Sequence, residues 1–256
     1  MLGNLEWTSA DGESAEASAF QLQLLGKFAL RQGETLILLP MCTQRLVAFL
    51  TIHGPAPRPV IMGTLWPDVG ESYARASLRT AIWRLHRCAP LLIRADGDVL
   101  VLSPEVGVDS RQLAEAAQFA LHNTSHSVVS TMIVRAGGEL LPGWYDDWVI
   151  FERERVRQLR LHVLDALAER LIAQARYAEA LEAALECARI EPLRESSNRL
   201  IIAIHLAEDN VAEAVRHYEF FRDLLRIELG IEPSPRLAGL LPAQRCRPVP
   251  LQVTAR

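Results

Sequence analysis

The sequence predicts an α+β N-terminal winged helix-turn-helix domain followed by an all-α domain of tetratricopeptide-like helical repeats. Three observations predict it: strand patterns that flank three helical patterns before residue 109, an Arg-rich third helix, and a helical second half with an internal repeat. The chain has 256 residues, 50% apolar and 23% charged, which suffices for two ordinary soluble domains. We expect a flexible tail at 1–19, the first domain at 20–109, the second at 110–241 and another tail at 242–256.

The first elements are short strands and two helices. From Phe20 to Leu30 the residues alternate apolar and polar around Gly26, and a second turn follows at Gln32-Gly33, so short antiparallel strands are expected. Residues 43–51 place their apolar side chains on one helical face, and a run rich in Pro ends this helix. A second short helix is predicted from Val60 to Trp66.

The third helix is predicted from about Ser72 to Cys88. It follows Pro67, which lacks an amide hydrogen and disfavours helical geometry in the residue before it. At 100° per residue, Leu78, Ile82 and Leu85 share one narrow face that suits a small core. The side chains on the opposite side are Tyr73, Ala76, Arg79, Thr80, Trp83, Arg84 and Arg87.

This third helix and its flank carry local positive charge. Residues 71–94 contain five arginines (Arg75, Arg79, Arg84, Arg87 and Arg94) and one carboxylate, so the segment carries 5 − 1 = +4 in a chain of net charge −4. A guanidinium can hydrogen-bond two acceptors on a guanine edge or hold a phosphate. The alternative for such a helix taken alone is a solvated face whose arginines pair with acidic neighbours.

A β-hairpin is predicted after this helix. Asp96-Gly97 lies between strand-forming residues, which is a strong short-range hairpin signal. The order of strands, helix, helix, basic helix and hairpin is that of a winged helix, in which the third helix enters the major groove of DNA.

The second half begins with a helix after Asp109 and an aromatic cluster. Pro142-Gly143 predicts a turn, and Trp144, Tyr145 and Trp148 follow it. We expect these aromatic side chains to fill the space between their own segment and the helices after it, with ligand stacking as the alternative. The charged run over residues 152–157 is expected to form a solvated helix face.

A repeat of 34 residues follows. Residues 176–181 (RYAEAL) recur as residues 210–215 (NVAEAV), and 210 − 176 = 34. Ile-Glu-Pro follows each copy. A helix-turn-helix period of this length is typical of tetratricopeptide-like repeats, which stack helix pairs into surfaces that bind other proteins.

Together, these motifs carry a resemblance. The pieces QRLVAFLTIHG, RPVIMGTLWPD, ARASLRTAIWRLHR and DGDVLVLSPEVGVD resemble, in this order, the OmpR-like DNA-binding domain of the Streptomyces antibiotic regulatory protein family. LLPGWYDDW, the repeats and RIELGIEPSPRL resemble the bacterial transcriptional activator domain that follows it in that family. The resemblance covers about Phe20 to Leu241.

The resemblance implies a sequence-specific transcriptional activator. It places Arg79, Thr80, Trp83, Arg84 and Arg87 on the side that faces the groove, and it implies double-stranded promoter DNA as the partner of this side. With Arg75 and Arg94 of the same basic segment, these residues are the predicted DNA contacts. RNA polymerase or a second copy of the chain is the expected partner of the helical repeats. A fragment ending near Ser110 is expected to retain DNA binding and to lose activation.

Other functional classes find little support. The seven histidines form no H-E-x-x-H motif, and the chain has no G-x-S-x-G or phosphate-binding G-x-x-x-x-G-K-[ST] sequence. The four cysteines are scattered, which predicts buried, reduced thiols rather than a zinc site. We therefore expect no enzymatic activity, no cofactor and no metal site. The alternative to a DNA-binding regulator is a protein-interaction scaffold whose winged helix no longer binds DNA.

The location follows from two further features. Residues 1–19 contain four acidic residues and no Lys or Arg, unlike a signal peptide. No apolar run approaches the roughly 18 residues that cross a bilayer. A cytoplasmic protein without a membrane partner is expected.

Overall fold

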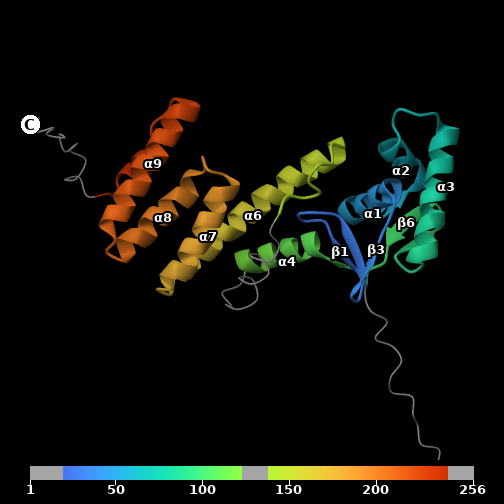
Figure 1. The fold of residues 1–256 in the computed structure, drawn as a ribbon, viewed down its shortest axis with the longest axis horizontal. Coiled ribbons are helices and arrows are strands. Elements are labelled where there is room, and N and C mark those ends of the chain that lie inside the picture. The colour runs from blue at the N-terminus through green and yellow to red at the C-terminus, as the bar shows by residue number, and fades with distance from the viewer. Residues whose placement is uncertain (1–19, 123–137, 242–256) are drawn as a thin grey trace, which may run out of the picture. The chain divides into compact units, whose positions relative to one another are not determined.

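The computed structural model describes residues 20–122 and 138–241. Their contacts form two compact units, which are described separately: residues 20–112 with 138–153, and residues 113–122 with 154–241. Figure 1 shows the elements of both units in chain order. Among the residues described, no helix is long and apolar enough to cross a membrane.

The first unit contains two small sheets and three helices. The first sheet has the order β3-β2-β1-β7, and the second has the order β4-β6-β5. The strands are β1 (Phe20–Gln23), β2 (Ala29–Gln32), β3 (Thr35–Ile37), β4 (Ala56–Pro57), β5 (Ile93–Asp96), β6 (Val99–Leu102) and β7 (Gly107–Val108). The helices are α1 (Met41–His53), α2 (Arg58–Leu65) and α3 (Glu71–Cys88). The predicted α+β region and its element order are confirmed.

The hairpin of β5 and β6 has its turn one residue later than expected. Asp96 pairs with Val99, so the two-residue loop is Gly97-Asp98. Gly97 has φ of +58°, and Gly in the first loop position suits a type II′ turn. Strands β4 and β7 were not predicted as separate elements, because each has only two residues and β7 pairs in parallel with β1, which is distant in the sequence.

Residues 138–153, here called the Trp144 segment, pack on this first unit. Leu140 forms a β-bridge with Leu25, and the Leu141 amide donates to the Leu24 carbonyl at 2.8 Å. Gly138 has φ of +139°, and a Cβ atom there would lie 2.6 Å from the backbone of Gly26. The approach of the two backbones therefore requires glycine.

The aromatic residues of the Trp144 segment contact the first unit. Trp144 is buried, with its ring centroid 6.1 Å from that of Phe28, and Trp148 meets the Phe49 ring edge-on at 5.6 Å. Tyr145 is 82% exposed. The expectation that all three rings pack on the helices that follow was wrong, since periodicity says nothing about which neighbour a segment covers.

The charged run over residues 152–157 also differs from the expected solvated face at Arg153. Its guanidinium donates to the carbonyls of Leu140, Leu141 and Trp144 at 2.7–2.9 Å and pairs with Glu139. Arg153 therefore fixes the fold of the Trp144 segment.

The second unit is helical. It contains the C-terminal parts of α4 (Asp109–His122) and α6 (Asp147–Ala173), whose first residues belong to the first unit. The helices α7 (Tyr177–Ile190), α8 (Glu195–Ala207), α9 (Val211–Leu229) and α10 (Pro235–Ala238) follow. Figure 1 shows α7, α8 and α9 as successive neighbours. The predicted all-helical second half is confirmed, and the expected tails at 1–19 and 242–256 lie outside the described residues.

The 34-residue repeat has a structural counterpart. Helices α7 and α9 begin 211 − 177 = 34 residues apart, and the left-handed residues before them, Ala175 and Asp209, have φ of 57° and 59°. The amides of Arg176 and Asn210 donate to carbonyls five residues earlier, at 2.9 and 2.8 Å. Both turns thus close the preceding helix by the same Schellman-type hydrogen bond.

Candidate nucleic-acid interface

Helix α3 is held to the core of the first unit by small and branched apolar side chains. Ala74, Leu78, Ala81 and Leu85 are buried, whereas Ile82 is half-buried. The core face is therefore centred slightly further toward Ala81 than the sequence pattern predicted. Helix α3 begins after Gly70 and ends before Pro90. Glu71 lies in its first turn, where a negative charge is favoured by the helix dipole.

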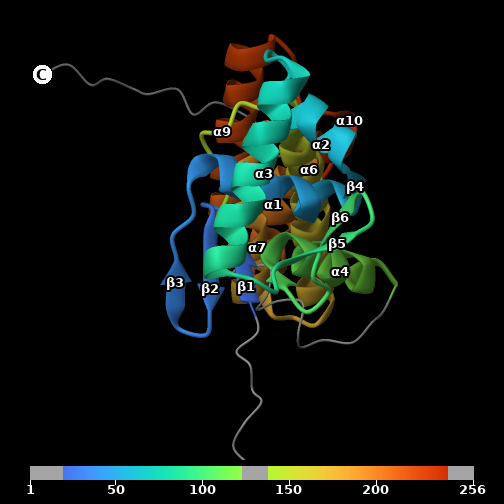
Figure 2. The same ribbon diagram turned by 90° about the vertical axis from the view of Figure 1, so that its right-hand side faces the viewer.

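The opposite side of α3 is open to solvent. Figure 2 shows α3 in front of α1 and α2, facing the viewer. All six predicted contact residues on this helix are exposed: Arg75, Arg79, Thr80, Trp83, Arg84 and Arg87. The helix thus presents cationic and aromatic side chains together on one accessible surface.

Trp83 and Arg87 form the centre of this surface. They lie one turn apart and nearly opposite the buried residues, and the Arg87 guanidinium carbon lies 4.9 Å from the centroid of the Trp83 ring. Trp83 is 56% exposed, which is unusual for so large an apolar side chain. The stacked indole restricts the Arg87 side chain while leaving its N–H groups able to donate.

The other contact residues on α3 have local partners. Arg75 pairs with Glu71 one turn earlier, and the Thr80 hydroxyl donates to the Ala76 carbonyl at 2.9 Å. Arg84 lies at the side of α3 toward α1, where its Nη1 is 3.7 Å from the Cys42 sulfur. Arg84 is thus at the flank of the exposed face rather than at its centre.

Two predicted contact residues have neither an ion-pair partner, a side-chain hydrogen bond nor a ring contact among the residues described. One is Arg79 on α3, and the other is Arg94, which lies exposed on β5 opposite Val101. Arg94 belongs to the hairpin and is not part of the α3 surface. The sequence did not single out Arg58, which begins α2 and lines a hollow with Arg75 and Arg79. Its only signal was its place in a turn before a helix.

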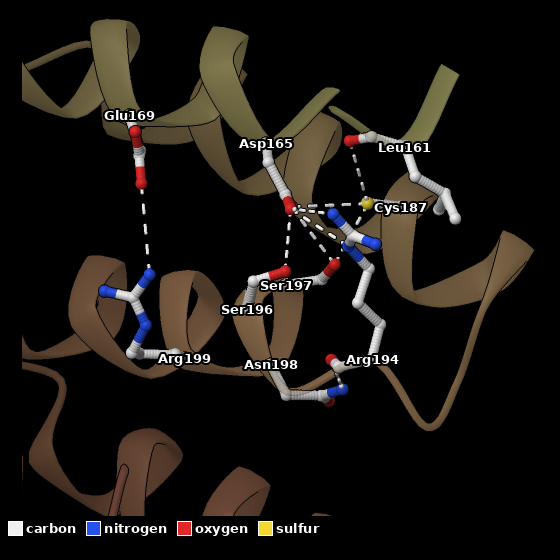
Figure 3. A network of polar contacts seen from close by, with 9 residues as sticks. All are labelled: Leu161, Asp165, Glu169, Cys187, Arg194, Ser196, Ser197, Asn198 and Arg199. Carbon is white, nitrogen blue, oxygen red and sulfur yellow. Dashed lines mark hydrogen bonds and ion pairs between the residues drawn. The ribbon is translucent and has the colours of Figure 1, made fainter. Parts of the chain in front are cut away.

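The second unit uses its charged residues differently. Figure 3 shows Asp165 of α6 as the centre of a polar network. Its carboxylate accepts from the Arg194 guanidinium and the Ser196 hydroxyl at 3.0 and 2.7 Å, and from Ser197 at 3.2 Å. Ser197 is also 2.9 Å from the sulfur of Cys187. The network joins α6, α7 and α8.

Cys187 is the buried thiol of this network. Burial raises the pKa of Cys187 from an ordinary value of 9.0 to about 12, and the neighbouring Asp165 carboxylate acts in the same direction. Cys187 therefore stays a neutral, unreactive thiol near neutral pH. Cys88, by contrast, is exposed on α3, so the expectation that the cysteines are buried does not hold for it.

Within residues 20–122 and 138–241, no group of His, Cys, Asp and Glu side chains has an arrangement that could hold a metal ion.

His217, one of the seven histidines, lies with its Nε2 2.9 Å from the Asn198 side-chain oxygen, and burial lowers the pKa of His217. This contact joins α8 and α9 and serves packing.

Comparison with protein families explains the helical half. Residues 135–243 match the bacterial transcriptional activator domain. The chain carries a bacterial transcriptional activator domain. The matched range includes the Trp144 segment, although the residues of this segment make their contacts within the first unit.

Two curated proteins extend the similarity to the first unit. The regulatory protein AfsR of Streptomyces coelicolor is 29% identical over 241 residues, which cover 89% of this chain and 24% of AfsR. AfsR of Streptomyces griseus is 27% identical over 241 residues, covering 88% of this chain and 24% of that protein. The chain is a distant homologue of these regulators and spans about a quarter of their length.

A solved structure supports the fold. Mycobacterium tuberculosis EmbR, in a complex with a low affinity phosphopeptide, matches with a TM-score of 0.70 and 21% sequence identity, covering 87% of this chain and 64% of EmbR. This likeness confirms the predicted fold, an α+β N-terminal region with small sheets followed by an all-helical region that matches the bacterial transcriptional activator domain.

Proposed function

We propose that the chain is a sequence-specific DNA-binding transcriptional activator that inserts α3 into the major groove of promoter DNA. The observation that carries this proposal is the exposed arginine-rich side of α3, which lies opposite its buried core residues. A helix in this position of a winged-helix unit is the one that reads base edges. The similarity to proteins named as regulators supports the same assignment.

The contact residues have different expected roles. Arg79, Arg84 and Arg87 have the planar donors that suit a guanine edge or a phosphate, and Thr80 has a hydroxyl that suits a phosphate or a base. Trp83 positions Arg87 by stacking. Arg75, at the edge of this surface, and Arg94, on the β5-β6 hairpin, are assigned to the DNA backbone.

We assign DNA recognition to residues 20–109 and the contact with RNA polymerase, or with a second copy of the chain, to residues 110–241. Stacked helical repeats offer accessible surfaces of the kind that bind proteins. The tails at 1–19 and 242–256 have no assigned role. This regulator acts without catalysis, in the cytoplasm, where promoter DNA is found.

Selection of bound fragments from a random DNA pool tests the proposal. We expect enrichment of one sequence family, and Arg79→Ala combined with Arg87→Ala should abolish that enrichment while the protein remains folded by circular dichroism. Arg216→Ala is the control, because Arg216 is also exposed but lies on α9. Failure of the parent chain to enrich any sequence would instead favour the protein-interaction scaffold.

A further inference from the structure

A hollow of about 260 Å³ lies beside the exposed side of α3. The start of α2, the first half of α3 and the turn of the β5-β6 hairpin enclose it. Its floor is apolar, and its rim carries three guanidinium groups and one carboxylate. The floor residues are Pro59, Met62 and Leu78, and the rim residues are Arg58, Arg75, Arg79 and Asp98.

The backbone at the rim is fixed. The Arg58 amide donates to the Asp98 carbonyl at 3.0 Å, which ties the hairpin turn to the first residue of α2. The two side chains are held less firmly, since Arg58 Nε and Asp98 Oδ1 lie 3.7 Å apart and the Asp98 side chain is 63% exposed. An ion pair this open contributes little, so Arg58 can exchange Asp98 for another anion at small cost.

The arginines of the hollow remain available for a ligand. Among the described residues, Arg75 forms an ion pair with Glu71 alone, and both side chains are more than 60% exposed. Arg79 has no ion-pair partner in the described part of the chain. Three arginines therefore line a hollow whose nearby carboxylates, Glu71 and Asp98, are both exposed.

The chemistry of the hollow matches one unit of a DNA backbone. Guanidinium groups on the rim suit a phosphate, and an apolar floor suits the C–H groups of the attached deoxyribose. Arg75 and Arg79 belong to both the hollow and the α3 surface, so a strand whose bases meet α3 would pass this hollow. An isolated inorganic anion would gain nothing from the apolar floor.

We propose that this hollow holds a backbone phosphate with its deoxyribose, that Arg58 is a DNA contact, and that Asp98 weakens DNA binding by engaging Arg58. The inference rests on the proposed function, because it names a second part of the same DNA-binding surface. It adds α2 and the hairpin turn to an interface that the sequence limited to α3 and Arg94.

Two variants of the full chain test this inference by fluorescence anisotropy over a range of salt concentrations. Arg58→Gln should weaken binding to the selected site and to unrelated duplex DNA by the same factor, and should reduce the slope of log K against log salt by about 0.9. Asp98→Asn should tighten binding to both DNAs by up to about fivefold, the equivalent of one exposed ion pair.

The double variant and two matched controls separate the mechanism from a general charge effect. If Asp98 acts through Arg58, the gain from Asp98→Asn should disappear when Arg58→Gln is also present. Arg31→Gln on β2 and Glu105→Gln, two exposed residues that do not line the hollow, should leave the affinity and the slope unchanged. Circular dichroism and thermal melting should show that all variants fold.

The outcomes are distinct. If the parent chain binds DNA with a steep salt dependence while Arg58→Gln and Asp98→Asn behave like the parent, the hollow is not a backbone site and the proposed function survives. If the controls change binding as much as the two variants, the effect is general charge and the inference is wrong. If the parent chain binds no DNA, the inference and the proposed function both fail.

Discussion

The helical repeats of the second unit and the α3–β5 region of the first unit place their arginines in opposite ways. In the helical repeats, Arg157, Arg160, Arg176, Arg189 and Arg194 each pair with a carboxylate of the same unit. On α3 and β5, Arg79, Arg87 and Arg94 have no ion-pair partner in the part of the chain that the structure describes. Charge that is neutralised within a fold stabilises helix contacts, whereas charge left exposed and unpaired is available to an external polyanion.

Two ion pairs of the helical repeats illustrate the first use. Arg160 is 7% exposed and pairs with Glu186, although burial lowers its pKa, and Arg194 pairs with Asp165 of α6. Such partly buried pairs fix how neighbouring helices meet, because removal of one partner leaves the other charge without compensation. The Trp83–Arg87 stack illustrates the second use, since it orders an arginine without neutralising it.

The largest predicted effect concerns the completeness of the first unit. A fragment of residues 1–110 lacks Leu140, Leu141 and Trp144, which are buried in the full chain and worth roughly 1.5–3 kcal/mol each. The loss of about 5–9 kcal/mol is comparable to the stability of a whole domain. Urea unfolding should show a cooperative transition for residues 1–153 and none, or a much earlier one, for residues 1–110.

This prediction revises the fragment suggested by the sequence. A fragment of residues 1–110 that unfolds as cooperatively as residues 1–153 would show that the Trp144 segment is dispensable. The exposed arginines of α3 should therefore be studied in a DNA-binding fragment of residues 1–153.

The second prediction separates the two sides of α3. Leu78→Ala removes a side chain that is 2% exposed and should lower the free energy of unfolding by about 2–5 kcal/mol. Arg87→Gln should change it by less than about 0.5 kcal/mol, because the residue is exposed. Chemical denaturation measures both, and equal losses would mean that the core and solvent faces of α3 have been misassigned.

The third prediction concerns Cys187, the buried thiol of the network around Asp165. The pKa of Cys187 is about 12 in the folded chain and 9.0 ordinarily. The contribution of this protonated thiol to the free energy of unfolding is therefore complete below pH 9 and is lost as pH rises toward 12. Between these values stability should fall by up to about 1.4 kcal/mol per pH unit more steeply in the parent than in Cys187→Ala. Unfolding curves at about pH 8 and about pH 10.5 measure the difference.

Identical pH dependence in the parent and Cys187→Ala would contradict the burial of this thiol. Thiol labelling offers a check within the same molecule. Cys88 on α3 should react readily with a thiol reagent in the folded chain, and Cys187 should react only after unfolding.

The sequence predicted most of the fold because its patterns are local. The buried face of α1 and the start of α3 after Gly70 follow from side-chain periodicity and from Gly and Pro. The 34-residue offset between the repeated segments equals the offset between the first residues of α7 and α9, at 177 and 211. These features depend on neighbours within one or two turns, where residue preferences decide the structure.

The remaining features depend on contacts between distant residues. The pairing of Gly107 with Gln21, the packing of Trp148 on Phe49 and the bond from the Arg58 amide to Asp98 join segments that no periodic pattern connects. The candidate site shows the same division. The helical wheel predicted that the α3 arginines are exposed. It could not predict that the Trp83 ring stacks on Arg87 or that a hollow lies beside Arg75.

The central claim is that the exposed arginines of α3 face DNA, and the salt dependence of binding tests it most directly. Affinity of the full chain for its selected DNA site should fall steeply, with a slope in log K against log salt of about −0.9 for each neutralised phosphate. Arg87→Gln should lower the affinity and, where Arg87 holds a phosphate, reduce the slope by about 0.9, whereas Arg216→Gln on α9 should do neither. A flat salt response of the parent chain, or equal losses from Arg87→Gln and Arg216→Gln, would contradict the claim.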